Sequence, residues 1–216
     1  DFIKLLGILK SGALPKDLEF SWLESSSHIF PFLKIFYRNS LVVESKLETK
    51  YRNSKIWIDV FCIDGLPSSR RQLKRVYAIS KVLRNFLYTS IVKPSSLHGI
   101  EKLGTILLKL VSKGIGAHRI SIWLDKFSQR YDFNSSEMIG NLSWGEHVGE
   151  AMEKSKYLPI ENLKFGENMF HCPKGYDEHL KNLYGDYMVL PPANKRGSHL
   201  IECYIMQEET VSSETT

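Results

Sequence analysis

The chain has 216 residues, of which 43% are hydrophobic and 25% are charged, and its formal net charge is +5. This composition excludes an intrinsically disordered chain and indicates a domain with a packed core. The basic balance favours anionic partners, which include phosphates, nucleotides, acidic glycans and membrane headgroups, and does not select one of them.

The amino-terminal part of the chain predicts one helix and two strands. Residues 1–10 carry apolar side chains at helical spacing, and this segment is expected to end at Gly12. The apolar residues of 29–45 are interrupted by a polar stretch at 38–40. This pattern predicts two strands joined by a turn, as in a β-hairpin.

The next segment predicts a strand, a turn and a long helix. Residues 56–63 are rich in β-branched and aromatic side chains, which indicates a buried strand, and the following D-G-L-P at 64–67 predicts a turn. A basic amphipathic helix is expected next, capped by Ser68 or Ser69, because its apolar residues lie on one stripe beside the cations of Arg70–Arg84.

The remainder of the chain predicts more helix and then shorter elements. Two helical patterns follow near 100–111 and 118–131, separated by a glycine-containing break. Short strands and loops then surround one predicted helix at Tyr176–Tyr184. We therefore predict a single α+β domain over 1–205, followed by a frayed Glu/Thr/Ser-rich tail at 206–216.

Cysteine usage and hydropathy bear on the location of the protein. The three cysteines are far apart and include no C-x-x-C pair, so neither a disulfide framework nor a zinc site is predicted. No run of about 18 apolar residues and no signal-peptide pattern is present. We expect a cytoplasmic protein, with peripheral contact to the inner face of the membrane left open.

Asp59 is the most informative single residue, because it lies within the apolar strand segment. A buried carboxylate is costly unless it is paired, hydrogen-bonded or bound to a metal, so Asp59 requires a partner. A catalytic role and a structural hydrogen bond both satisfy this requirement. Strand alternation places Asp59 on the same face as Trp57, Phe61 and Ile63, whereas Asp64 is expected to shape the turn.

Two separated motifs carry a resemblance to a known family. Residues 58–67 read I-D-V-F-C-I-D-G-L-P, which is similar to the I-D-[IV]-F-P-[IL]-D-G-L-P signature of LicD phosphotransferases, with Cys62 in place of the usual proline. The closing motif of the family resembles the segment P-K-G-Y-D-E-H-L at 173–180 and the segment L-Y-G-D-Y-M at 183–188, followed by Pro191-Pro192. The resemblance extends over nearly the whole chain.

This resemblance implies a nucleotidyltransferase-like fold with a mixed sheet and a largely helical middle and C-terminal portion. It implies transfer of a phosphoalcohol, such as phosphocholine from a CDP-choline-like donor, to a hydroxyl of a cell-surface glycan such as lipopolysaccharide or teichoic acid. Mg²⁺ would be the cofactor, held by three carboxylates next to the donor pyrophosphate. Asp59 would be one of them, as a metal ligand and catalytic residue.

The other two carboxylates of the family belong to a D-D-D-x-D type motif that is not in this sequence. By family order this motif precedes Asp1, and the chain has no initiator Met. We therefore expect the chain to be truncated at its amino end. The alternative hypothesis is a non-catalytic glycan- or nucleotide-binding remnant. A nucleic-acid-binding function is not predicted, because the basic residues form no recognised motif.

Two cations near the first strand pair are candidate phosphate ligands. Lys34 lies in a segment similar to one that carries a lysine in the family, and a point charge there could hold a donor phosphate. Arg38 is a further candidate, although the arginine of the family usually comes earlier. The alternative for Lys34 is a solvated hairpin lysine.

Four residues of the closing motif are candidate donor-binding residues. Tyr184 and Asp186 flank a glycine and could cover a base or sugar, and a packing corner is the alternative. Arg196 and His199 follow the two prolines and could reach a phosphate or a proton in transit. A solvated surface loop is the alternative for these two residues.

Overall fold

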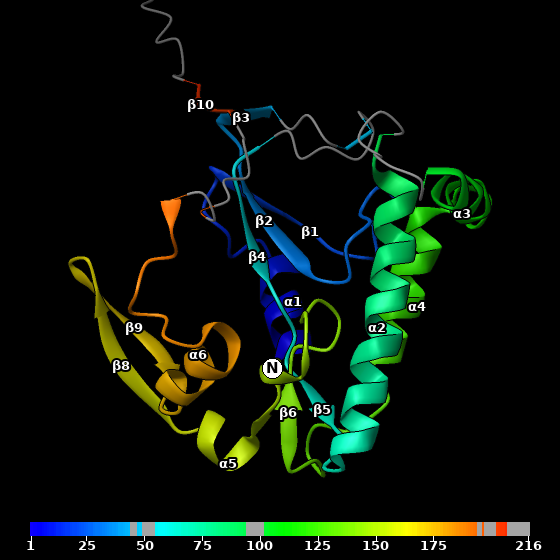
Figure 1. Ribbon diagram of the computed structural model, residues 1–216. Coiled ribbons are helices and arrows are strands. Elements are labelled where there is room, and N and C mark those ends of the chain that lie inside the picture. Colours follow the sequence, from blue (N-terminus) through cyan, green and yellow to red (C-terminus); the bar gives the residue numbers. More distant parts are fainter. Residues whose placement is uncertain (44–46, 49–54, 94–101, 194–195, 197–201, 207–216) are drawn as a thin grey trace, which may run out of the picture.

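The computed structural model describes residues 1–43, 47–48, 55–93, 102–193, 196 and 202–206. Their helices are α1 (Phe2–Lys10), α2 (Arg70–Ile91), α3 (Lys102–Ile115), α4 (Ala117–Ser128), α5 (Lys154–Tyr157) and α6 (Tyr176–Tyr184), with a 3-10 turn at Val148–Glu150. Their strands form four small sheets, and every pairing between described strands is antiparallel (Figure 1). The predicted α+β class is confirmed. The predicted mixed sheet is not found among the described strands, because all of their pairings are antiparallel, and the nucleotidyltransferase-like fold stays a prediction.

The central sheet has the strand order β1 (Leu18–Ser21), β2 (Leu33–Tyr37), β4 (Trp57–Val60). The predicted hairpin at 29–45 is wrong, because the second of its strands, β3 (Ser40–Val43), pairs with the distant β10 (Glu202–Ile205) instead of β2. Long-range strand pairing therefore overrides the local turn signal.

Ser40 stabilises the point where β3 leaves the central sheet. Its buried hydroxyl donates to the carbonyl of Tyr37 at 2.6 Å and accepts from the amide of Ile56 at 2.9 Å. These two bonds join the end of β2 to the residue that precedes β4. The chain can then turn away after residue 40 while β4 enters the sheet beside β2.

The segment predicted as a buried strand and a turn is in fact two short strands. β4 lies at the edge of its sheet, so it is only partly buried, and Ile58 is 67% exposed. Residues 64–66 form β5 (Asp64–Leu66) rather than a turn, and β5 pairs with β6 (Met138–Gly140). β6 also pairs with β7 (Met152–Glu153). The turn prediction failed because the partner strand is more than 70 residues away along the chain.

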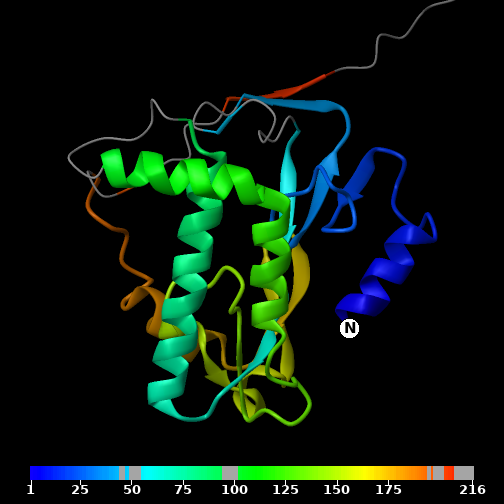
Figure 2. The ribbon, with the colours of Figure 1, turned by 90° about the vertical axis from the view of Figure 1, so that its right-hand side faces the viewer.

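Three helices cover one side of the sheets (Figure 2). The basic amphipathic helix α2 is confirmed, and α4 runs beside it while α3 crosses their ends. Leu87 and Ile91 of α2 pack with Ala117 and Ile120 of α4. The predicted break falls at Gly116, whose φ of 92° favours glycine.

The carboxy-terminal part contains a projecting hairpin and the helix α6 (Figure 1). The hairpin pairs β8 (Ile160–Phe165) with β9 (Asn168–Pro173). Helix α6 has the bounds predicted from the sequence. Except for Met206, the predicted tail lies outside the described residues. None of the described helices is both long and apolar enough to cross a membrane.

Candidate functional site

Asp59 of β4 lies opposite Lys34 of β2 in the central sheet. Because opposite residues of an antiparallel pair point to the same face, the two side chains meet, and Lys34 Nζ donates to Asp59 Oδ1 at 2.6 Å. The lysine side chain is 4% exposed and the aspartate side chain is 29% exposed. The prediction that Asp59 requires a partner is confirmed, and this partner is the lysine that the sequence identified separately.

Aromatic rings surround the ammonium group of Lys34. Its Nζ lies 4.7 Å from the ring centroid of Phe30, 5.1 Å from that of Phe32 and 4.6 Å from that of Trp57. Ring faces attract a cation, and this attraction is stronger where water is excluded. Asp59 and the three rings together compensate the buried charge. In this arrangement the Lys34 ammonium binds the Asp59 carboxylate. Contact between Lys34 and a donor phosphate stays a prediction.

Two further aromatic residues pack against the rings that surround Lys34. Phe61 packs against Phe32 with their centroids 4.7 Å apart, and Trp144 packs edge-on against Phe32 at 5.0 Å and Phe30 at 5.9 Å. We call Phe30, Phe32, Trp57, Phe61 and Trp144 the aromatic cluster. Sequence alternation had placed Trp57 and Phe61 on the face of Asp59, but Phe30 and Trp144 reach the cluster only through the tertiary fold.

His28 fixes the segment that carries Phe30 and Phe32. It is buried, and its Nε2 donates to the carbonyl of Phe32 at 2.8 Å while Nδ1 lies 3.0 Å from the hydroxyl of Ser21. Burial lowers the pKa of His28, and the positive charge of Lys34 lowers it further. A neutral imidazole fits both hydrogen bonds, because one nitrogen donates and the other accepts. His28 belongs to no motif in the sequence, and its role follows only from the fold.

The described residues contain one carboxylate suited to the predicted magnesium ion. Asp59 Oδ2 makes no hydrogen bond within the described part of the chain, so it could face a cation. No group of three or more His, Cys, Asp or Glu that could hold a metal occurs among these residues. Because Mg²⁺ is commonly held by one or two carboxylates together with substrate phosphates, Asp59 fits as a single ligand and not as a complete site.

Asp64 is not the simple turn residue that the sequence suggested. Burial, and then the nearby carboxylate of Asp125 on α4, raise its pKa to about 6. Its Oδ2 is buried and has no hydrogen-bond partner in the described structure. Burial and the charge of Asp64 also raise the pKa of the Cys62 thiol to about 12, so this cysteine stays protonated at neutral pH. Asp125 was missed because its proximity to β5 is not visible from sequence.

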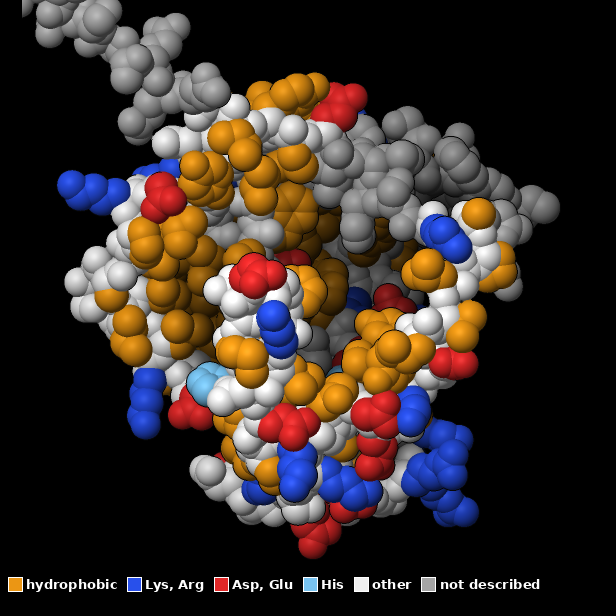
Figure 3. Space-filling view, turned by 90° about the vertical axis from the view of Figure 1, so that its left-hand side faces the viewer, with side chains coloured by type: hydrophobic (Ala, Val, Ile, Leu, Met, Phe, Trp, Pro, Cys, Tyr) orange, Lys and Arg blue, Asp and Glu red, His pale blue; other side chains and the backbone are white. Residues whose placement is uncertain are grey.

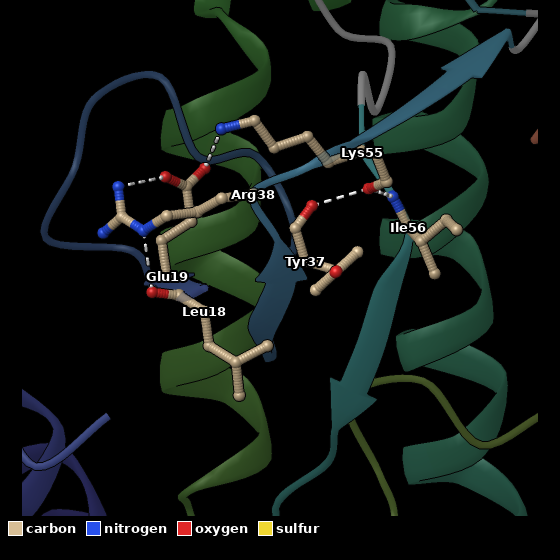
Figure 4. Close-up of polar contacts among 7 residues, drawn as sticks. Leu18, Glu19, Tyr37, Arg38, Lys55 and Ile56 are labelled. Atoms are coloured by element: carbon tan, nitrogen blue, oxygen red, sulfur yellow. Dashed lines mark hydrogen bonds and ion pairs between the residues drawn. The ribbon is translucent and has the colours of Figure 1, made fainter. Parts of the chain in front are cut away.

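Arg38 binds two groups of β1 at the end of the central sheet (Figure 4). Its guanidinium lies 3.1 Å from the Glu19 carboxylate, and its Nε donates to the carbonyl of Leu18 at 2.9 Å. Lys55 binds the same carboxylate at 2.7 Å. Both cations are therefore bridged by Glu19, which ties the ends of β1 and β2 to the segment that leads into β4. Phosphate binding by Arg38 would require it to compete with this carboxylate.

The candidate residues of the closing motif make local contacts. Tyr184 and Asp186 are exposed on either side of Gly185, whose φ of 69° ends α6. Arg196 is also exposed, and its Nε donates to the carbonyl of Pro191 at 2.7 Å. His199 lies outside the described residues. No hydrogen bond or ion pair between described residues joins these side chains to Asp59, and their donor-binding roles stay predictions.

These features define an α+β protein whose candidate site is a lysine–aspartate pair enclosed by aromatic rings. The chain is 27% identical over 172 residues to the lipopolysaccharide cholinephosphotransferase LicD of Haemophilus influenzae. The match covers 74% of this chain and 60% of LicD. It supports the relationship to the LicD family that the two motifs indicated. No family model matches the chain, and no solved structure matches it significantly.

Proposed function

We propose that this protein acts as a phosphotransferase that moves a phosphoalcohol, such as phosphocholine, from a CDP-activated donor to a hydroxyl of a cell-surface glycan. The observation that carries the proposal is the similarity to LicD, which is a lipopolysaccharide cholinephosphotransferase. The Lys34–Asp59 pair supports it, because a partly exposed carboxylate on a rigid strand is a suitable group for phosphoryl transfer.

The proposed reaction exchanges one phosphorus–oxygen bond for another. The acceptor hydroxyl oxygen attacks the phosphorus that carries the alcohol, the bond from that phosphorus to the CMP oxygen breaks, and the hydroxyl proton passes to water. Catalysis of such a transfer depends mainly on positioning and on charge stabilisation. Lys34 contributes to positioning, because its Nζ holds one carboxylate oxygen of Asp59 at 2.6 Å. Asp59 Oδ2 then remains to face the reacting groups.

Magnesium is part of the proposal, with Asp59 as the ligand that the described chain provides. When bound, the ion would neutralise charge on the donor pyrophosphate. Lys34 holds the Asp59 carboxylate on the central sheet, so the ligand would be positioned before the ion arrives. The non-catalytic alternative is not favoured by similarity to a transferase.

CMP release tests the proposal directly. The protein is incubated with Mg²⁺, candidate glycans and a panel of CDP-choline, CDP-ethanolamine, CDP-glycerol and CDP-ribitol. We expect acceptor-dependent CMP release with at least one donor. Asp59→Asn is expected to lower the rate by on the order of 100-fold or more, as for other groups that stabilise transition-state charge. It should also raise the Mg²⁺ concentration needed for half-maximal rate.

Glu24→Gln is the matched control for this experiment. Glu24 also pairs with a lysine at 2.6 Å, but both side chains of that pair are largely exposed. Its substitution removes the same charge without touching the candidate site, so the rate should not change. Absence of CMP release with every donor, or equal rates for the Asp59 and Glu24 variants, would contradict the proposal.

A further inference from the structure

Positive charge is concentrated in the three helices on one side of the protein. Helices α2, α3 and α4 contain eleven lysine and arginine residues but only one carboxylate, Asp125. The chain has 29 basic and 24 acidic residues, so the remaining segments have 18 basic and 23 acidic residues. The small overall charge of +5 therefore conceals a basic helical layer and an acidic remainder.

The basic residues on the outer surface of this layer lack internal partners. Five exposed cations of α2 form neither an ion pair nor a side-chain hydrogen bond within the described part of the chain: Arg70, Arg71, Lys74, Arg75 and Lys81. Arg119 and Lys126 of α4 are also exposed and make no such contact there. Helix α2 has no acidic residue along its 22 residues, so the helix itself supplies no carboxylate to neutralise its outward side.

Other cations of the layer serve the fold. Arg84 donates to the carbonyl of Trp144, and Lys109 and Lys113 of α3 both bind Glu48. These groups point to the interior or to a carboxylate. Among the described side chains of the three helices, these structural cations differ from the solvent-facing ones, which remain available to an external partner.

Exposed apolar side chains are interleaved with the outward cations. Val82 of α2 is 67% exposed and Trp123 of α4 is 47% exposed, and Ile79 and Tyr88 are further exposed residues of α2. Trp123 lies between Arg119 and Lys126 on one stripe of α4, since residues three and four apart share a helix face. A surface that mixes cations with aromatic and aliphatic groups is typical of contact with a membrane interface.

The helical layer forms a broad side of the molecule, with α2 and α4 side by side (Figure 2). The opposite side shows a different distribution, in which acidic and basic side chains are intermingled around apolar ones (Figure 3). We propose that the outward face of α2 and α4, which we call the basic face, docks on an anionic lipid bilayer. Charge complementarity selects this occupant, because phospholipid headgroups supply a plane of negative charge.

The apolar residues of the basic face favour a bilayer over a soluble polyanion. Val82 and Trp123 gain contact with the acyl boundary of a bilayer, whereas a glycan or a nucleic-acid backbone would leave Val82 in water. The inference concerns binding alone and does not depend on the proposed transferase activity. A failed donor assay and a failed membrane assay are therefore separate outcomes.

Co-sedimentation with vesicles tests the inference. Vesicles of phosphatidylcholine and phosphatidylglycerol at a 3:1 ratio are compared with pure phosphatidylcholine in about 0.1 M salt, where charges interact over about 10 Å. We expect binding to the anionic vesicles and much weaker binding to the neutral ones. Binding should fall as salt is raised, because the attraction is screened.

A triple variant that removes three positive charges from α2, together with a matched control, locates the contact. Each basic residue at an anionic surface strengthens binding by about five-fold, so the combination of Arg71→Gln, Lys74→Gln and Arg75→Gln should weaken it by about 100-fold. The control combines Lys4→Gln, Lys16→Gln and Lys164→Gln, which are exposed lysines outside the helical layer. It removes the same net charge and should change binding by less than about five-fold.

Val82→Ser distinguishes a bilayer from a soluble polyanion. This variant should weaken vesicle binding several-fold and leave binding to heparin or duplex DNA unchanged. Circular dichroism establishes that each variant retains its helix content. The inference is overturned if the two triple variants bind equally, if phosphatidylglycerol makes no difference, or if the protein binds heparin or DNA but not vesicles.

Discussion

Replacement of Lys34 by methionine gives the sharpest test of the candidate site. Methionine keeps most of the length of the lysine side chain and can occupy the space between Phe30, Phe32 and Trp57. It removes the ammonium that binds Asp59 at 2.6 Å. The carboxylate then loses this partner and stays beside aromatic rings, with 29% of its side chain exposed to water.

The magnitude follows from the geometry of the pair. Two unit charges 2.6 Å apart attract by about 6 kcal/mol at an effective dielectric constant of about 20. Desolvation of the two ions offsets several kcal/mol of this attraction. Loss of one partner from a buried pair typically costs about 3–5 kcal/mol, and the partial exposure of Asp59 places the expected loss near 3 kcal/mol. A change of this size lowers Tm by about 6–12 °C.

A double-mutant cycle isolates the interaction between the two side chains. Lys34→Met, Asp59→Asn and the double variant are compared by chemical denaturation, and we expect a coupling energy of about 2–3 kcal/mol. The Lys10–Glu24 pair is the matched control, because its distance is also 2.6 Å but its side chains are 48% and 62% exposed. Its coupling energy, from Lys10→Met and Glu24→Gln, should be about 0.2–1 kcal/mol.

The coupling energies of the Lys34–Asp59 and Lys10–Glu24 pairs show whether burial strengthens the first pair. Equal coupling energies would mean that burial beneath the aromatic cluster adds nothing to the interaction. The same conclusion would follow if Lys34→Met were neutral. Either result would refute the argument that Lys34 positions the Asp59 carboxylate.

Two further predictions concern β5. The carboxyl of Asp64 in β5 has a pKa of about 6 in the folded protein, whereas the ordinary value for aspartate is 3.8. Between these two values the folded state binds more protons than the unfolded state, so the free energy of unfolding falls as pH rises through this window. Asp64→Asn should therefore stabilise the protein by about 1–2 kcal/mol at pH 7.5 and by little at pH 4, as measured by chemical denaturation at the two pH values. Gly65→Ala should lower the free energy of unfolding by about 2–3 kcal/mol, because the new Cβ would lie 2.5 Å from Ser136 Oγ and within 2.8 Å of two backbone oxygens. Gly7→Ala in α1 meets no atom within 4 Å and should instead stabilise by about 0.5–1 kcal/mol; equal denaturation midpoints for the two alanine variants would contradict this reasoning.

The sequence by itself determined the features that depend on neighbouring residues. Helix α6 has its predicted bounds, α2 shows its predicted amphipathic pattern, and the break between α3 and α4 falls at a glycine. Helices are set by contacts three or four residues apart, so their periodicity is readable along the chain. The requirement that Asp59 be paired also follows from the cost of burying a charge, whatever the fold.

Only the tertiary structure decided which distant residues meet. β3 pairs with β10 rather than β2, and β5 pairs with β6 rather than forming a turn, because strand pairing depends on long-range register that local patterns do not encode. The same register places Lys34 opposite Asp59, although 25 positions separate them. The sequence showed that Asp59 needed a partner, and the pairing of β2 with β4 identified it.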